Sequence, residues 1–158
     1  YTTRRMTAFP QPDRGAIDGG RHRYALRVFY EDTDAGGVVY HANYLRWFER
    51  ARSDLVELFG IDQRAALDAG DGLYTVAEVH LRYLSPARLG DTVLVETTAR
   101  HVGRVSCTLH QVALRGDTRL AEATVKVGFI GPDGRPRKQP AHWQDAFTAF
   151  AEGLEGQE

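Results

Sequence analysis

The sequence predicts an α+β domain in which one long helix packs against an antiparallel sheet. Apolar residues first recur at steps of three and four, the period of one helical face: Tyr44, Trp47, Phe48, Ala51, Leu55, Leu58 and Phe59. Four runs with alternating apolar residues follow: Leu73–Leu84, Thr92–His101, Val105–Leu114 and Leu120–Ile130. Short links join these runs, so neighbouring strands are expected to form antiparallel hairpins. A helix followed by strands, rather than alternating with them, is typical of an α+β fold.

The long helix is expected to begin at Asn43, because asparagine is a good N-cap, and to stop near Gly60. Its first turn would present unpaired backbone N–H groups and the positive end of the helix dipole to the neighbourhood of His41. Such a helix end can bind an oxyanion.

The remaining elements are shorter. Residues 1–20 mix Thr, Arg, Pro, Gly and Asp without a period, which predicts a flexible N-terminal arm. The folded domain is then expected over residues 21–140, with a tail or short helix over 141–158. Three further elements are expected: a strand over Tyr24–Tyr30, a short helix over Ile61–Ala69 and a short helix over His142–Glu152. Strict alternation would place these residues of the first long strand on one face: Leu73, Thr75, Ala77, Val79, Leu81 and Tyr83.

Composition narrows the possible functions. At 158 residues with 42% hydrophobic content, the chain can form one domain with a substantial core. A net charge of −1 argues against a nucleic-acid-binding protein. No apolar run is long enough for a transmembrane segment, and the N-terminus lacks the apolar core of a secretory signal. Cys107 is the single cysteine and the six histidines lack metal-ligand spacing, so neither a disulfide nor a metal site is expected. A reducing, cytoplasmic setting is compatible with this composition.

The segment Glu31–Tyr44 combines carboxylates, a glycine pair and a Tyr-His pair directly before the long helix. Asp34 precedes Ala35-Gly36-Gly37, and Val38-Val39-Tyr40 would return the chain to the interior. This context would partly desolvate the Asp34 carboxylate, which makes it a candidate base or nucleophile. From spacing alone, a turn-capping aspartate is the simpler interpretation. Glu31 and Asp32 are expected to be solvated or salt-bridged surface carboxylates.

The run YEDTDAGGVVYHANYLRWFERAR, from Tyr30 to Arg52, closely resembles the active-site segment of the hotdog-fold acyl-CoA thioesterases. The resemblance is strongest to the bacterial branch associated with the Tol-Pal envelope system, and more distant to 4-hydroxybenzoyl-CoA thioesterase. A weaker similarity through YLSPARLGD and the later strands reaches about Pro140. The resemblance implies a curved antiparallel sheet wrapped around a central helix, and it implies a dimer, often doubled to a tetramer, with active sites at the dimer interface.

The resemblance also implies roles for individual residues. Asp34 would be the catalytic nucleophile or general base, and the backbone N–H of His41 would polarise the thioester carbonyl. The His41 side chain would orient the carboxylate or a water molecule. Residues around these two are candidates for the oxyanion site or the acyl pocket: Gly37, Val38, Tyr40, Asn43, Tyr44 and Trp47. For Tyr40, Tyr44 and Trp47, packing against the sheet is the simpler expectation, with lining of an acyl pocket as the alternative. Candidates for binding CoA are Arg82, Arg88, Arg104 and Ser106, each of which has a solvated surface role as its alternative.

The function implied is hydrolysis of an acyl-CoA thioester without a cofactor, either by direct attack of Asp34 or through an activated water. The alternative is a non-catalytic protein of the same fold that binds acyl-CoA or acyl-carrier protein, or acts as a scaffold in an envelope complex. A hotdog dehydratase is a third possibility, although the segment does not resemble that branch. The substrate would be aliphatic in the Tol-Pal-associated branch and aromatic in the hydroxybenzoyl branch. A single sheet against one helix leaves its edges uncovered, which also favours a homo-oligomer.

Overall fold

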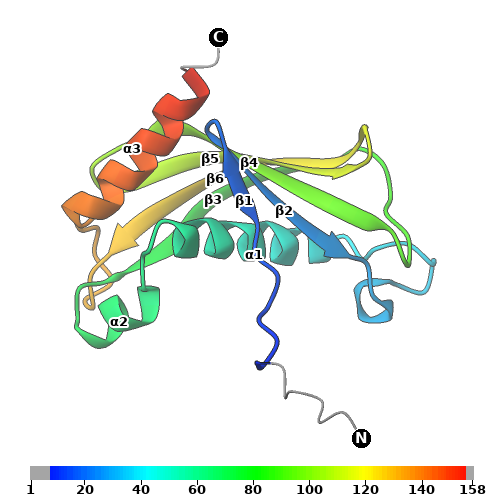
Figure 1. Cartoon of the computed structure of the whole chain (residues 1–158), viewed down its shortest axis with the longest axis horizontal. Coiled ribbons are helices and arrows are strands. Elements are labelled where there is room, and N and C mark those ends of the chain that lie inside the picture. The colour runs from blue at the N-terminus through cyan, green and yellow to red at the C-terminus, as the bar shows by residue number, and fades with distance from the viewer. Residues whose placement is uncertain (1–7, 156–158) are drawn as a thin grey trace, which may run out of the picture.

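A six-stranded antiparallel sheet curves around one long helix (Figure 1). The computed structural model describes residues 8–155. The strands are β1 (Ala16–Asp18), β2 (Arg21–Arg27), β3 (Leu73–Tyr83), β4 (Thr92–Val102), β5 (Ser106–Arg115) and β6 (Thr118–Ile130). The helices are α1 (Asn43–Leu58), α2 (Gln63–Asp68) and α3 (Ala141–Glu155), with a 3₁₀ turn at Tyr30–Asp32. This architecture confirms the predicted α+β class and the predicted wrapping of a sheet around a long helix.

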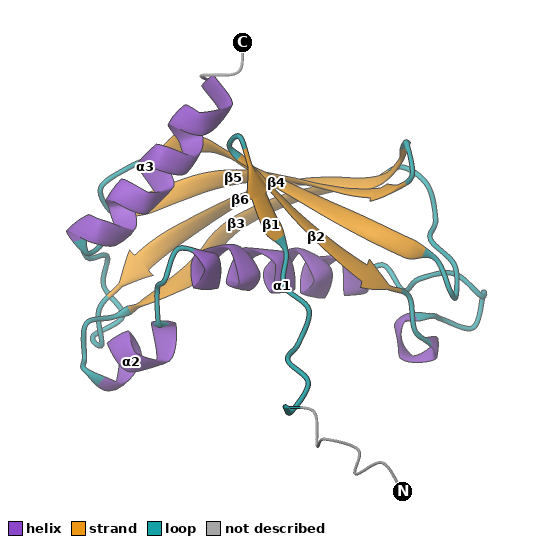
Figure 2. Cartoon of the chain, in the orientation of Figure 1, coloured by secondary structure: helices purple, strands orange, loops and turns teal. Residues whose placement is uncertain are grey.

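The strand order is β1-β2-β4-β5-β6-β3, which corrects one expectation about neighbours. The pairs β4–β5 and β5–β6 are hairpins as predicted, but β3 pairs with β6 rather than with β4. The link from β3 to β4 crosses the ends of the intervening strands, and the N–H groups of Leu84 and Ser85 both bond to the carbonyl of Leu120. As a result, β3 is a sheet edge (Figure 2).

The N-terminal part of the chain departs further from expectation. Residues 1–7 of the expected arm lie outside the described residues, but Ala16–Asp18 form strand β1 instead of a flexible segment. Gly19 and Gly20 both have positive φ (54° and 81°), which suits a tight two-residue hairpin turn to β2. The strand expected over Tyr24–Tyr30 begins earlier and ends at Arg27, because the chain turns into the 3₁₀ segment.

The apolar face of α1 is buried against the concave face of the sheet, as its periodicity predicted. Tyr44, Trp47, Phe48, Ala51 and Leu55 are all buried, and the helix ends at Leu58 before Gly60, whose φ is +78°. The helix expected near the C-terminus is α3, whose Trp143 and Phe147 pack against Tyr74. The short helix expected over Ile61–Ala69 is α2. No helix among residues 8–155 is both long enough and apolar enough to cross a membrane.

A buried polar contact fastens α1 to the N-terminal hairpin. The His22 ring, which has no exposed surface, lies with Nε2 2.6 Å from Asp54 Oδ2 of α1. The same carboxylate oxygen accepts the backbone N–H of Gly15 at 3.0 Å. A Cβ at position 15 would lie 2.6 Å from the carbonyl oxygen of Arg23, so only glycine permits this approach. Burial lowers the pKa of His22 below its usual value, although the hydrogen bond and charge of Asp54 oppose the shift.

On the opposite flank of α1, Arg52 donates to Oε1 of the fully buried Gln111 at 2.9 Å. The Gln111 amide in turn donates to the carbonyl of Phe48 at 2.9 Å and to Thr97 Oγ1 at 3.0 Å. These contacts link both sides of the helix to the sheet.

The His22 contact predicts a pH dependence of stability. Because the folded-state pKa is lowered, the unfolded chain binds a proton first as the pH falls below about 6.5. The free energy of unfolding should therefore be highest above that pH and decrease as the pH falls toward the folded-state pKa. Denaturant titrations at a series of pH values should show this slope in the wild-type protein and lose much of it in His22→Gln. His101→Gln, at an exposed histidine, should keep the slope. An unchanged slope in His22→Gln would contradict the prediction.

Candidate active site

Asp34 sits in a tight turn that its own side chain stabilises. Its Oδ1 accepts the N–H of Gly36 at 2.8 Å, and its carbonyl accepts the N–H of Gly37 at 3.0 Å. Gly37 has φ +78°, a conformation that glycine adopts without strain. The carboxylate is exposed in the single chain, which contradicts the expected partial desolvation. Val39 is buried, but Val38 only partly returns to the interior, so the turn projects into solvent.

Asp32 holds this turn against the start of α1. Its carboxylate accepts the N–H of Phe29 at 2.8 Å and the side-chain amide of Asn43 at 2.9 Å, while its carbonyl accepts the N–H of Tyr40. Asp32 is therefore a structural clamp, not the solvated or salt-bridged surface carboxylate that was expected. Asn43 does not cap the helix either. The N-cap position is Ala42, without a side-chain cap, because the Asn43 amide is turned toward Asp32.

The helix N-terminus next to Asp34 leaves backbone donors open. Among the described residues, the N–H groups of His41 and Ala42 have no hydrogen-bond acceptor. They lie at the positive end of the helix dipole, where a negative oxygen is stabilised. The His41 side chain is exposed, and its ring lies 4.4 Å from that of Tyr40 between centroids.

An open hollow of about 370 Å³ joins the Asp34 turn, the helix start and the end of β3. Its lining residues are Asp34, Val38, Val39, His41, Tyr44, Tyr83, Leu84, Ser85 and Pro86. The structure thus brings together four of the predicted site residues: Asp34, Val38, His41 and Tyr44. The other four, Gly37, Tyr40, Asn43 and Trp47, do not line the hollow, and Trp47 is buried in the core.

Sequence reasoning missed the wall formed by Tyr83 to Pro86. The hydroxyl oxygen of Tyr44 accepts the N–H of Ala87 at 3.2 Å, and Arg115 binds both the Pro86 carbonyl and the Asp91 carboxylate. The backbone N–H of Arg88, with Arg115 adding to it, lowers the pKa of Asp91. The alternating strand pattern gave no indication of this wall, because only the crossing path of the link places it near Asp34.

The arginines expected to bind CoA occupy different places. Arg88 is exposed on the link beside the hollow, and its backbone bridges to Val38. Arg82 is paired with Glu122 at 2.9 Å. Arg104 and Ser106 lie at the β4–β5 hairpin, toward the start of β3, and therefore at the opposite end of the sheet from Asp34.

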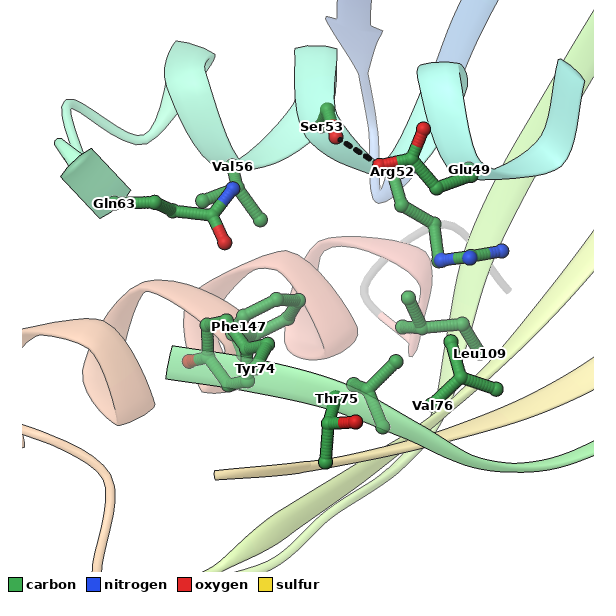
Figure 3. A pocket seen from close by; sticks show the side chains of 11 residues that line it. Glu49, Arg52, Ser53, Val56, Gln63, Tyr74, Thr75, Val76, Leu109 and Phe147 are labelled. Atoms are coloured by element: carbon green, nitrogen blue, oxygen red, sulfur yellow. Dashed lines mark hydrogen bonds between the residues drawn. The ribbon is translucent and has the colours of Figure 1, made fainter. Parts of the chain in front are cut away.

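A second, smaller cavity of about 100 Å³ lies between α1 and the beginning of β3 (Figure 3). The helix contributes Glu49, Arg52 and Ser53, with Ser53 donating to Glu49 at 3.0 Å. Burial lowers the pKa of Arg52. The remaining lining residues are Val56, Gln63, Tyr74, Thr75, Val76, Leu109, Val127 and Phe147. The cavity has apolar walls, with the charged side chains of Glu49 and Arg52 among its lining residues. It was not predicted from the sequence.

The family model described as "Thioesterase superfamily" matches residues 36–122, more than half of the chain. The chain belongs to the thioesterase superfamily. It is 38% identical over 114 residues to the acyl-CoA thioesterase YbgC of Haemophilus influenzae, covering 72% of this chain and 83% of that protein. It is 37% identical over 120 residues to an acyl-CoA thioester hydrolase YbgC of Escherichia coli, covering 75% and 89%.

Among solved structures, the thioesterase chain resembles a probable thioesterase from Bartonella henselae. The TM-score is 0.72 at 28% identity, covering 76% of this chain and 99% of that one. These similarities confirm the resemblance to hotdog thioesterases and the fold. The family match begins at Gly36, two residues after Asp34, so it does not assign a role to that carboxylate.

The clamp role of Asp32 predicts a stability effect that its neighbour should not share. Asp32→Ala would leave the Asn43 amide, on a residue only 8% exposed, without its partner. An unsatisfied buried polar group costs about 1–3 kcal/mol, so the free energy of unfolding should decrease by that order. Glu31→Ala, at an exposed carboxylate one position away, should change it by less than about 0.5 kcal/mol. Denaturant unfolding of the two variants checks this, and equal losses would refute the clamp.

Proposed function

We propose that this protein hydrolyses acyl-CoA thioesters at the hollow between Asp34 and the start of α1. The observation that carries the proposal is that an exposed carboxylate and an open helix N-terminus line one hollow. The similarity to proteins named acyl-CoA thioesterase and acyl-CoA thioester hydrolase supports the same conclusion.

The chemistry follows from these two groups. The thioester carbonyl would lie against the helix start, where the N–H of His41 stabilises the developing oxyanion. Asp34 then either attacks the carbonyl carbon, giving a mixed anhydride, or removes a proton from an attacking water. The CoA thiolate leaves readily, so no strong general acid is required. The exposed His41 ring lines the same hollow and would orient the carboxylate or a water molecule.

The open site also supports the proposed homo-oligomer. Strand β3 is an eleven-residue edge with exposed apolar side chains at Val76, Val79 and Tyr83. A long edge with exposed apolar side chains is a template for pairing with another strand. Two β3 edges paired antiparallel would place the hollow of one copy beside the small cavity of the other, and they would cover Asp34 from solvent. A dimer of this kind, or a tetramer built from two, supplies the desolvation that a single chain lacks.

The substrate proposed first is an aliphatic acyl-CoA, with an aromatic acyl-CoA second. Gly36-Gly37 and Tyr40-His41 both match the Tol-Pal-associated branch, which favours the aliphatic substrate. Arg88, which is exposed and whose backbone bridges to Val38 of the hollow, is the cation we propose for the CoA phosphates. An acyl-carrier protein thioester, a cytoplasmic location and a link to the Tol-Pal system remain parts of the proposal. A panel of acyl-CoA substrates of increasing chain length, with benzoyl-CoA included, tests the preference.

One observation favours the non-catalytic alternative. Asp34 is exposed and accepts the Gly36 N–H, which is the behaviour of a turn-capping residue. A protein that only binds acyl-CoA or acyl-carrier protein would retain this turn without turnover.

Asp34→Asn separates the two functions, because the amide keeps the Oδ1 acceptor for Gly36 but cannot act as base or nucleophile. We expect hydrolysis to fall by about 10³-fold or more while the thermal midpoint changes by less than about 2 °C. Steady-state assays with the preferred acyl-CoA and a melting curve on the same sample provide the measurement. Asp71→Asn, an exposed carboxylate beyond α2, is the control and should keep full activity. If stability and activity fall together in Asp34→Asn, the carboxylate is structural.

A charged substitution on the β3 edge tests the assembly. Val79→Asp would bring like charges together across a two-fold pair of β3 strands, so we expect monomers and a loss of most hydrolysis. Leu67→Asp places the same charge at an exposed apolar position of α2 and should leave both properties unchanged. Light scattering reports the mass and an acyl-CoA assay reports the activity. A stable, active wild-type monomer would exclude the paired edge.

A further inference from the structure

Tyr83, the last residue of β3, makes a contact with the start of α1 that the reaction outlined above does not use. Its hydroxyl donates to the backbone carbonyl of His41 at 2.7 Å. Its ring packs edge-on against the rings of His41 and Tyr44, with centroids 6.3 and 5.6 Å away. The side chain lines the hollow that contains Asp34 and is 49% exposed.

The carbonyl of His41 depends on this partner because His41 precedes the N-cap residue Ala42, so its carbonyl lies outside the hydrogen-bond ladder of α1. Only if the helix began one residue earlier would the N–H of Leu45 bond to the carbonyl of His41. Here the Leu45 N–H bonds instead to the carbonyl of Ala42 at 3.2 Å. The Tyr83 hydroxyl therefore supplies a hydrogen-bond donor to the His41 carbonyl, which receives none from the described residues of α1. This bond stabilises the backbone conformation at the helix start.

Each of the two peptide groups that flank His41 is thus fixed by one hydrogen bond. The carbonyl of Tyr40 accepts the N–H of Asn43 at 2.9 Å, which sets the direction of the His41 N–H in the same planar peptide. The carbonyl of His41 accepts the Tyr83 hydroxyl, which sets the direction of the Ala42 N–H. These two N–H groups are among the open donors at the helix start.

We propose that Tyr83 is a positioning residue for thioester hydrolysis, which orients the backbone donors at His41 and Ala42 from the edge of the sheet. This inference rests on the proposed function. The hydroxyl touches a carbonyl that does not react, so it acts through the peptide. A bond accepted by that carbonyl also polarises the N–H of Ala42 and makes it a better donor. Oriented donors matter more in the transition state than in the bound substrate, because the negative charge develops there.

Tyr83→Phe removes the hydroxyl and keeps the ring contacts with His41 and Tyr44. We expect kcat to fall about five- to tenfold, the effect of one hydrogen bond, with KM changed less than about twofold. The matched control is Tyr30→Phe, since the Tyr30 side chain is 84% exposed and its hydroxyl has no partner among the described residues. It should keep both constants.

A second measurement does not depend on turnover. Amide hydrogen exchange of the resting protein should be faster in Tyr83→Phe for the peptide that covers His41–Leu45 and unchanged in the buried strands β5 and β6. A merely structural tyrosine would change exchange along β3 and lower the thermal midpoint, with no preference for kcat over KM.

The outcomes are distinct. A wild-type protein that hydrolyses no acyl-CoA refutes the proposed function, whatever the exchange data show. An active wild type whose kcat is unchanged in Tyr83→Phe refutes the positioning role alone, as does equal exchange at the helix start in the two proteins. A lowered kcat together with faster local exchange, absent from Tyr30→Phe, establishes it.

Discussion

The position of α1 in the concave sheet is the constraint on which the rest of this structure depends. Trp47, Phe48 and Leu55 are almost completely buried there, and burying a large apolar side chain contributes about 1.5–3 kcal/mol. Apolar contacts of this kind fix the depth of the helix but are non-directional. The directional contacts are those on its flanks, where Arg52 meets Gln111 and Asp54 meets His22. Because breaking either would leave a buried polar group without a partner, they resist rotation and sliding of the helix.

A helix held in this way makes its N-terminus a fixed point, and the Asp34 turn is built outward from that point. The Asp32 carboxylate accepts the side-chain amide of Asn43 at the start of the helix, and the Asp32 carbonyl accepts the N–H of Tyr40. The site therefore consists of loops, but loops whose backbone groups are bonded to a rigid element. This explains how an exposed carboxylate can keep a defined place relative to the open donors at His41.

Local chemistry made much of this predictable from the sequence. The period of α1, its end near Gly60 and the β4–β5 and β5–β6 hairpins depend on neighbouring residues, and each was predicted correctly. The pairing of β3 with β6 was not, because it depends on a link that crosses the sheet rather than turning back. The side-chain alternation of β3 also failed, since a register shift between Val76 and Glu78 places Val76 on the same face as Val79.

In the candidate site, too, the features set by neighbouring residues could be predicted and those that depend on distant strands could not. Asp34 and His41 could be predicted as neighbours in one hollow because they are close in sequence and share a motif, whereas Tyr83 comes from a strand more than forty residues away. The role of Asp32 was predicted wrongly, because the sequence does not show that the folded chain brings the N–H of Phe29 and the amide of Asn43 to its carboxylate. Asn43 was misjudged for the same reason, since its amide has a stronger partner than the helix end.

The edge strand β3 connects these observations. One end of β3 lines the small cavity beside Arg52, and the other carries the hydroxyl that holds the His41 carbonyl. The β3 edge carries Glu78, Arg82 and a register shift between Val76 and Glu78, features that limit pairing, but it also presents the exposed apolar side chains of Val76, Val79 and Tyr83. In the proposed dimer, the same strand would therefore join the two copies, cover the exposed Asp34 and fix the backbone donors opposite it. Assembly and site geometry would then be two consequences of one edge, since a shift of β3 that disturbs the pairing must also move Tyr83 relative to α1.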